Sequence, residues 1–67
     1  MAKTISYVER YGTYSGDYMY FIHYENGDMD LYGEDNKPKE VRIWLAKAKG
    51  FQFCKSKRGE FYHRFTA

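Results

Sequence analysis

A chain of 67 residues suffices for one small domain with a marginal core, and we treat residues 1–67 as a single domain. With 43% hydrophobic and 21% aromatic residues, the composition excludes a low-complexity chain, and no stretch is apolar enough for a signal peptide or a membrane span. The single cysteine, Cys54, cannot form an internal disulfide, so we expect a cytoplasmic location.

The formal net charge of +2 conceals an uneven distribution. Residues 1–36 carry two cations and seven carboxylates, a net charge of −5, whereas residues 37–67 carry nine cations and two carboxylates, a net charge of +7. The two halves can attract each other within the fold. Alternatively, they form an acidic and a basic face, each suited to a charged partner.

A first strand is predicted over residues 5–11, which are rich in β-branched and aromatic side chains, and a turn over residues 12–17. The length of this turn is ambiguous. A three-residue loop places Val8 in the core opposite Ile22, whereas a two- or four-residue loop turns every side chain of the strand over. We expect Val8 inside. The outer face would then carry Tyr7, Glu9 and Tyr11.

A central hairpin is predicted at Asn26-Gly27, because both residues tolerate the positive φ of a two-residue type I′ turn. Such a turn pairs Tyr24 with Met29. It therefore places Met29 and Leu31 on the core side of the sheet. The opposite, outer face of this hairpin is predicted to carry Met19, Phe21, His23, Glu25, Asp28, Asp30 and Tyr32.

A helix is predicted from about Pro38 to about Lys49, with Asp35 or Asn36 as its N-cap. Its apolar residues recur at helical spacing and form one stripe that can pack on a sheet. The stripe consists of Val41, Trp44, Leu45 and Ala48.

A second hairpin is predicted over residues 51–54 and 60–65, joined by a three-residue turn that ends on Gly59 in the left-handed conformation. This register pairs Phe51 with Phe65. One face then carries Phe51, Phe53, Phe61, His63 and Phe65, and the other Gln52, Cys54, Tyr62 and Arg64. The fold class is therefore α+β: a three-stranded antiparallel meander, one amphipathic helix packed on the sheet, and a C-terminal β-hairpin (βββαββ). The sequence leaves open whether this hairpin extends the first sheet or lies across it.

Side chains suited to catalysis or metal binding are few and scattered. His23, Cys54 and His63 lack the spacing of metal ligands, and no base is placed beside Cys54. We expect His23 to face Asp30 as a cross-strand ion pair. We therefore expect no enzyme activity, no metal and no cofactor.

The first binding hypothesis is recognition of a protein by the outer face, since tyrosine gives a large contact area at low entropic cost. Carboxylates on that face would select a partner with a basic surface. Small phage-encoded inhibitors are similar in size and in their acidic, tyrosine-rich character. By that analogy of class we expect an inhibitor or regulator of a nucleic-acid-binding protein, with a homodimer as another use of the face. The predicted interface consists of Met19, Phe21, His23, Asp28, Asp30 and Tyr32.

The second hypothesis is DNA or RNA binding by the basic helix and the C-terminal hairpin. The predicted phosphate contacts are Lys47, Lys49, Lys55, Lys57, Arg58 and Arg64, with Tyr62 stacking on a base. We rank a protein partner first, because the aromatic residues of the predicted outer face lie among carboxylates, which repel a phosphate backbone.

Overall fold

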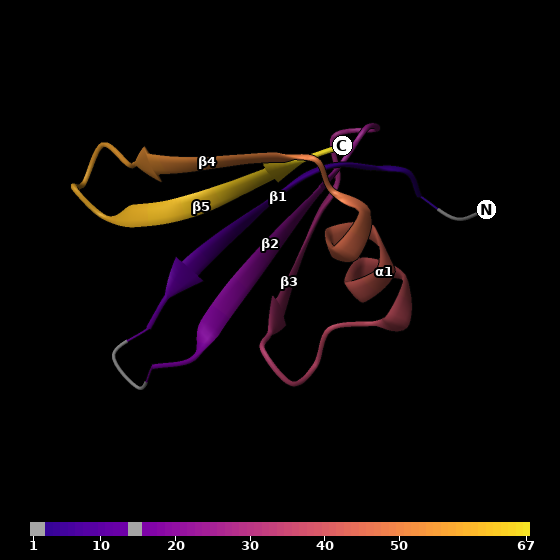
Figure 1. The fold of residues 1–67 in the computed structure, drawn as a ribbon, viewed down its shortest axis with the longest axis horizontal. Helices are drawn as coiled ribbons and strands as arrows, with labels where there is room; N and C mark the ends of the chain where they lie inside the picture. Colours follow the sequence, from indigo (N-terminus) through magenta and orange to yellow (C-terminus); the bar gives the residue numbers. More distant parts are fainter. Residues whose placement is uncertain (1–2, 14–15) are drawn as a thin grey trace.

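The computed structural model describes residues 3–13 and 16–67. It contains five antiparallel strands and one short helix in the order βββαββ, as the sequence predicts (Figure 1). The elements are β1 (Ile5–Gly12), β2 (Tyr18–Tyr24), β3 (Met29–Gly33), α1 (Lys39–Lys47), β4 (Gly50–Lys55) and β5 (Phe61–Thr66). Within the described residues, no helix has the length and hydropathy needed to cross a membrane.

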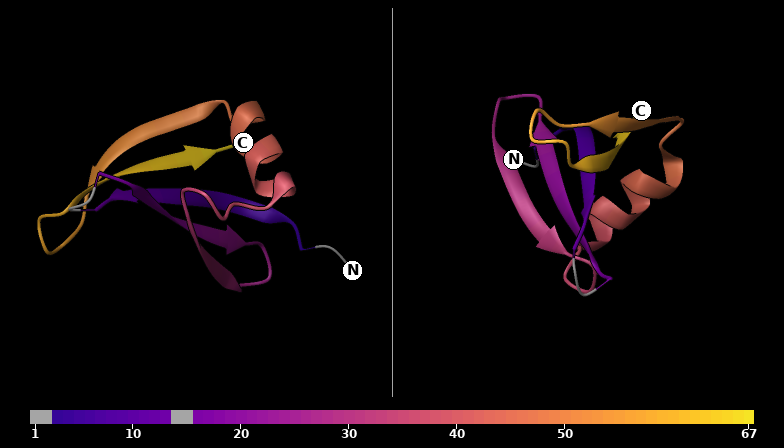
Figure 2. Two further views of the ribbon diagram at one scale, coloured as in Figure 1. Left: turned by 90° about the horizontal axis from the view of Figure 1, so that it is seen from below. Right: turned by 90° about the vertical axis from the view of Figure 1, so that its left-hand side faces the viewer.

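All five strands belong to one open sheet with the strand order β3-β2-β1-β5-β4. Strand β5 pairs with β1, with Phe65 opposite Val8, so the terminal hairpin extends the first meander. Figure 2 shows α1 on one side of this sheet, at the end opposite to the β4–β5 turn. The helix therefore covers only part of one sheet face.

The predicted register of β1 is confirmed. Val8 lies opposite Ile22, and both side chains are fully buried. An irregularity between Ile5 and Tyr7 shifts the pairing, which lets Ile5 pack against the same core as Val8 although three positions separate them. Tyr7, Glu9 and Tyr11 follow on the outer side, as predicted.

The core is small. Among the described residues, only Val8, Tyr20, Ile22 and Val41 are buried. Trp44 and Leu45 of the predicted helix stripe pack against this cluster. A core of four buried residues supplies little apolar stabilisation, which makes the fold sensitive to each of them.

The helix is shorter than predicted at both ends. Pro38 is its N-cap, and no side-chain cap is found among the described residues, so the prediction of a cap by Asp35 or Asn36 is wrong. The helix ends at Lys47, because the following residues are drawn into the sheet: the Lys49 N–H donates to the Thr66 carbonyl over 3.1 Å.

The predicted register of the β2–β3 hairpin is wrong by one residue. Phe21 lies opposite Leu31 and His23 opposite Met29, so the loop has three residues, 25–27. The Gly27 N–H donates to the Tyr24 carbonyl, and Gly27 has a φ of +91°. No described residue other than glycine has a positive φ, so the two-residue type I′ turn does not form.

Part of the physical reason lies in the side chain of Asn26. Its Oδ1 accepts the Asp28 N–H at 2.9 Å, and this short-range bond supports a turn in which glycine alone is left-handed. A slip of one residue turns every side chain of β3 over. Asp30 and Tyr32 therefore lie on the helix side, whereas Met29 and Leu31 lie on the outer side, contrary to prediction.

The predicted register of the β4–β5 hairpin is confirmed. Phe51 pairs with Phe65 and Phe53 with His63, and Gly59 has a φ of +86°. The Gly59 N–H donates to the Ser56 carbonyl, which closes the predicted turn. The phenylalanines and His63 lie on the helix side of the sheet, and Cys54 and Tyr62 lie on the outer side.

Candidate functional site

The outer face, which we define as the sheet surface opposite α1, brings together three of the predicted interface residues, Met19, Phe21 and His23. The corrected register adds Met29 and Leu31 beside them. The side chains of the outer face are those of Tyr7, Glu9, Tyr11, Met19, Phe21, His23, Met29, Leu31, Gln52, Cys54, Tyr62, Arg64 and Thr66.

The β2–β3 part of this face is apolar and uncovered within the described chain. Met29 is 52% exposed and Leu31 51% exposed, and Met19 and Phe21 are half-buried. We call these four residues, Met19, Phe21, Met29 and Leu31, the outer apolar patch. Single exposed apolar residues are ordinary, but a contiguous group on one sheet face marks a surface that another molecule can cover.

The β1 part of the outer face is held by contacts within the chain. His23 Nε2 donates to Glu9 Oε1 at 2.7 Å, so the predicted His23–Asp30 ion pair is wrong. The Tyr7 ring stacks on His23 at 4.2 Å, and the Arg64 guanidinium lies 4.3 Å from the centroid of the Tyr7 ring. These contacts occupy the β1 part of the face, although Arg64 Nε is buried without a hydrogen-bond partner, and they leave Met29 and Leu31 of β3 as the most exposed apolar residues of the outer face.

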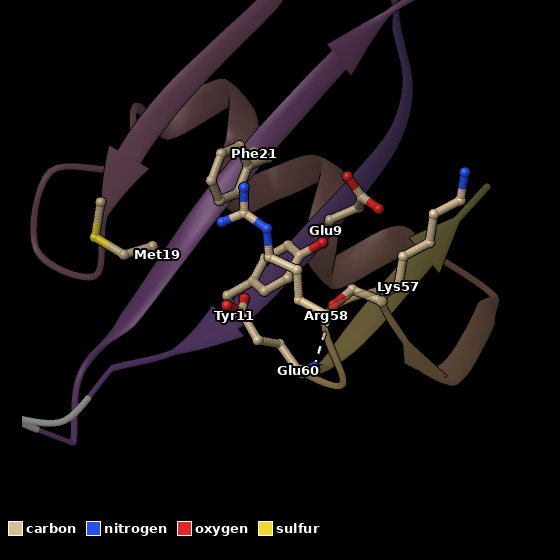
Figure 3. Close-up of a pocket in the computed structure, with 8 residues that line it drawn as sticks. Glu9, Tyr11, Met19, Phe21, Lys57, Arg58 and Glu60 are labelled. Atoms are coloured by element: carbon tan, nitrogen blue, oxygen red, sulfur yellow. Dashed lines mark hydrogen bonds between the residues drawn. The ribbon is translucent and has the colours of Figure 1, made fainter.

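A pocket of about 540 Å³ adjoins the outer apolar patch. Figure 3 shows Met19 and Phe21 on one side of it and residues of the β4–β5 turn on the other. Lys57 and Arg58 of that turn line it together with Glu9 and Glu60. The pocket therefore has apolar side chains from β1 and β2 and a mixed charged wall, and it continues the patch toward β5.

The carboxylates predicted on the outer face lie elsewhere. Asp30 is on the helix side, where it accepts hydrogen bonds from the hydroxyls of Tyr24 at 2.8 Å and Tyr32 at 3.5 Å. Asp28 lies in the β2–β3 turn, 3.1 Å from Lys3 Nζ, and this contact with the ammonium group lowers the pKa of its carboxyl. The placement of Asp28, Asp30 and Tyr32 on the outer face was wrong because it followed from the two-residue turn.

Acidic residues nevertheless border the patch, because they occupy the loops at both ends of the β2–β3 hairpin. Glu25 and Asp28 lie in the turn that joins the two strands. At the opposite end, Asp17 precedes β2, and Glu34 and Asp35 follow β3. The patch is thus apolar at its centre and has carboxylates at both ends of the hairpin, two of which are ion-paired, Asp28 with Lys3 and Glu34 with Lys37.

The raised pKa of the Tyr24 hydroxyl predicts a loss of stability at alkaline pH. Burial raises the pKa of its hydroxyl to about 12, and the hydrogen bond to Asp30 adds to the shift. Its ordinary pKa is 10.0, so between pH 10 and 12 the folded protein retains a proton that the unfolded chain releases. This stabilising contribution is complete below pH 10 and is lost as the pH rises through 12.

This pH dependence of stability is tested by denaturant unfolding at several pH values, with tyrosinate absorbance measured in parallel. We expect the free energy of unfolding to fall between pH 10 and 12, and to fall less steeply in Tyr24→Phe. Equal slopes for the two proteins would show that Tyr24 is not the titrating group.

The residues predicted to bind nucleic acid are not gathered on one surface. Lys47 and Lys49 lie at the end of α1 and just beyond it, and Lys57 and Arg58 lie in the β4–β5 turn. Lys55 is on the helix side of the sheet. Tyr62 and Arg64 are on the outer face, where Tyr62 stacks on Tyr11 at 4.7 Å and Arg64 lies over Tyr7. The predicted stacking residue, Tyr62, is therefore already stacked within the chain.

Sequence reasoning missed that the phenylalanines of the β4–β5 hairpin are exposed. Phe51, Phe53 and Phe61 are 57%, 64% and 57% exposed although they face the helix side. A helix of nine residues is about 13 Å long, whereas five strands span about 19 Å. Helix length compared with sheet width could have shown that α1 does not cover all of the sheet.

Among the described residues, no group of three or more His, Cys, Asp or Glu side chains is arranged to hold a metal ion. A scan against protein-family models finds no match, and searches of curated proteins and of solved structures find no similar protein.

Proposed function

We propose that this protein is a non-catalytic binding module, an inhibitor or regulator that docks on another protein through the outer apolar patch. The observation that supports the proposal most is the exposure of Met29 and Leu31 beside Met19 and Phe21, on a face that no described element covers. An apolar centre with a polar or charged rim is the usual anatomy of a protein interface.

The charges around the patch indicate the chemistry of the partner. Carboxylates occupy both ends of the β2–β3 hairpin, and residues 1–36 have a net charge of −5. A partner that has an apolar site bordered by Lys and Arg would fit this surface, and the opposite charges would accelerate encounter. The basic surface of a nucleic-acid-binding protein has this character, and covering it would inhibit that protein.

A second copy of this chain fits the patch less well. A symmetric dimer through the patch would place the acidic loops of both copies against each other, which costs energy. A head-to-tail arrangement would place Met29 and Leu31 against Gln52 and Arg64, the polar part of the outer face. The patch is therefore better matched to a different protein.

Leu31→Asp tests the proposal. Proteins retained from a lysate by the immobilised chain are compared with those retained by Leu31→Asp and by Gln52→Ala, a matched control on the outer face of β4. A protein that Leu31→Asp fails to retain but Gln52→Ala still retains is purified, and its affinity for the natural chain is measured by titration. We expect Leu31→Ala and Met29→Ala to weaken its binding about tenfold each, because truncation of a central apolar residue costs more than about 1 kcal/mol.

The site of contact is read independently from the methionines. Met19 and Met29 both belong to the outer apolar patch, so ¹³C-methyl methionine resonances report on it directly. We expect the partner to shift the signals of both. If the purified partner binds the Leu31→Ala and Met29→Ala variants as tightly as the natural chain, and both methyl signals stay unmoved, the patch is not the docking surface.

A further inference from the structure

The helix side of the β4–β5 hairpin carries a row of aromatic rings beyond the reach of α1. We call Phe51, Phe53, Phe61 and His63 the aromatic ladder. Phe53 stacks on Phe61 at 5.2 Å, Phe51 stacks on His63 at 5.1 Å, and Phe53 meets His63 edge-on at 5.3 Å. The three phenylalanines are more than half exposed, so the rings form a continuous aromatic surface open to solvent.

The ladder is held in place from within the sheet. Arg10 donates from Nη2 to His63 Nδ1 at 3.3 Å, and its guanidinium also lies 5.2 Å from the centroid of the Phe65 ring. Phe65 in turn meets Phe51 edge-on at 5.1 Å and packs against the core. These contacts fix the positions of the exposed rings before a ligand binds. The rings therefore lose little conformational entropy on binding.

One lysine borders the ladder directly. Lys55 Nζ lies 5.5 Å from the centroid of the Phe61 ring. Lys49, just before β4, is exposed, whereas Lys57 and Arg58 of the adjoining β4–β5 turn line the pocket on the outer side of the sheet. From residue 41 to residue 67 the sequence contains a single carboxylate, that of Glu60. The aromatic surface therefore lies in the strongly basic half of the protein.

We propose that the aromatic ladder binds single-stranded nucleic acid. Exposed rings on an antiparallel sheet provide aromatic contacts for unpaired bases, and Lys55 beside them provides a cation for a phosphate. A duplex hides its base faces, so the ladder selects single strands. This activity goes beyond the proposed protein docking, because it uses the opposite face of the sheet and the other charge half of the chain.

The positive charge beside the ladder also argues against a second protein molecule, such as another copy of this chain, as its ligand. Lysine is depleted at the centres of protein interfaces. Two copies of the chain packed ladder to ladder would bring their lysines together without compensating carboxylates. A polyanion, by contrast, is attracted by every charged group that borders the rings apart from Glu60.

Fluorescence anisotropy with labelled single-stranded DNA and RNA, and with a duplex of the same sequence, tests the proposal at low and high salt. We expect both single strands to bind more tightly than the duplex. Phe53→Ala should weaken single-strand binding about tenfold or more, since loss of one ring–base stack has effects of that size. Phe53→Leu should weaken it similarly, because leucine retains apolar contact but has no ring.

The contribution of the cations is measured by salt dependence. Lys55→Gln should reduce the slope of log K against log salt by about 0.7, the value for one phosphate contact on a single strand. Phe53→Ala should leave that slope unchanged. Lys55 is exposed, so Lys55→Gln should keep the thermal stability of the natural chain. Phe53→Ala loses the ring contacts with Phe61 and His63, so it should be slightly less stable but still folded at the assay temperature.

Leu31→Ala on the opposite face is the matched control and should leave nucleic-acid binding unchanged. Conversely, Phe53→Ala should leave binding of the protein partner unchanged, so the two proposals can fail separately. The ladder proposal is overturned by an absence of single-strand binding at low salt, or by equal affinity for duplex and single strand with no effect of Phe53→Ala. A concentration-dependent dimer in sedimentation, abolished by Phe53→Ala, would instead assign the ladder to a second copy.

Discussion

Ile22→Ala is expected to remove about 2–5 kcal/mol of folding free energy, the usual cost of truncating a fully buried isoleucine. A single small core rarely supplies more than about 3–5 kcal/mol at this chain length, so the loss is comparable to the whole folding free energy and the unfolded fraction of the variant should rise strongly. Ile22 belongs to the only buried cluster in the described part of the chain, so no second buried cluster can compensate for the lost packing. Circular dichroism during denaturant unfolding measures the effect.

Leu31→Ala is the matched control and also tests the register of the β2–β3 hairpin. In the structure Leu31 is 51% exposed on the outer face, so we expect a change within about 0.5 kcal/mol. In the two-residue Asn26-Gly27 turn, Leu31 would lie opposite Ile22 and share its burial. Destabilisation of Leu31→Ala comparable to that of Ile22→Ala would therefore show that β3 pairs in the other register.

Gly50→Ala is expected to destabilise the fold by about 1–3 kcal/mol, the range for a side chain forced into occupied space. Gly50 lies opposite Thr66 in the β4–β5 pair. A Cβ at this position would overlap Thr66 Oγ1 and come within 3.2 Å of Thr66 Cβ. Relief of the clash would shift the end of β5, whose carbonyl at Thr66 accepts the Lys49 N–H.

A double-mutant cycle isolates this contact. Thr66→Ala removes the overlapping oxygen, so the combined variant should recover part of the loss, and Gly50→Ala with Thr66→Gly should recover more. Gly12→Ala is the control, because a Cβ there has no heavy atom within 4 Å. If Gly50→Ala is as harmless as Gly12→Ala, the two strand ends do not approach as closely as the structure shows.

The two hairpins show where reasoning from sequence succeeds. In the β4–β5 hairpin, Gly59 in the left-handed position and four phenylalanines on one face support the same register, and the structure has that register. In the β2–β3 hairpin, Asn26-Gly27 suits both a two-residue turn and a three-residue turn with only the glycine left-handed. Local sequence alone does not choose between them.

The choice depends on contacts made outside the turn. Lys3 contacts Asp28, the Tyr24 hydroxyl donates to Asp30, and the Tyr32 ring packs against the core, all in the observed register. The hydrogen bond lies within the hairpin, but the contacts of Lys3 and of the Tyr32 ring exist only once the N-terminal segment and the core are assembled. The predicted outer face was consequently half correct: the β1 and β2 residues lie there, and those of β3 are replaced by their neighbours.

The amino-acid sequence by itself determined the order of the elements, the burial of Val8, the faces of the terminal hairpin and the division of charge, because each follows from side-chain periodicity or from one turn. Tertiary structure decided the register of β3, the joining of β5 to β1 and the exposure of the aromatic ladder. These depend on how distant segments compete for the same space, and a nine-residue helix leaves uncovered whatever lies beyond its length.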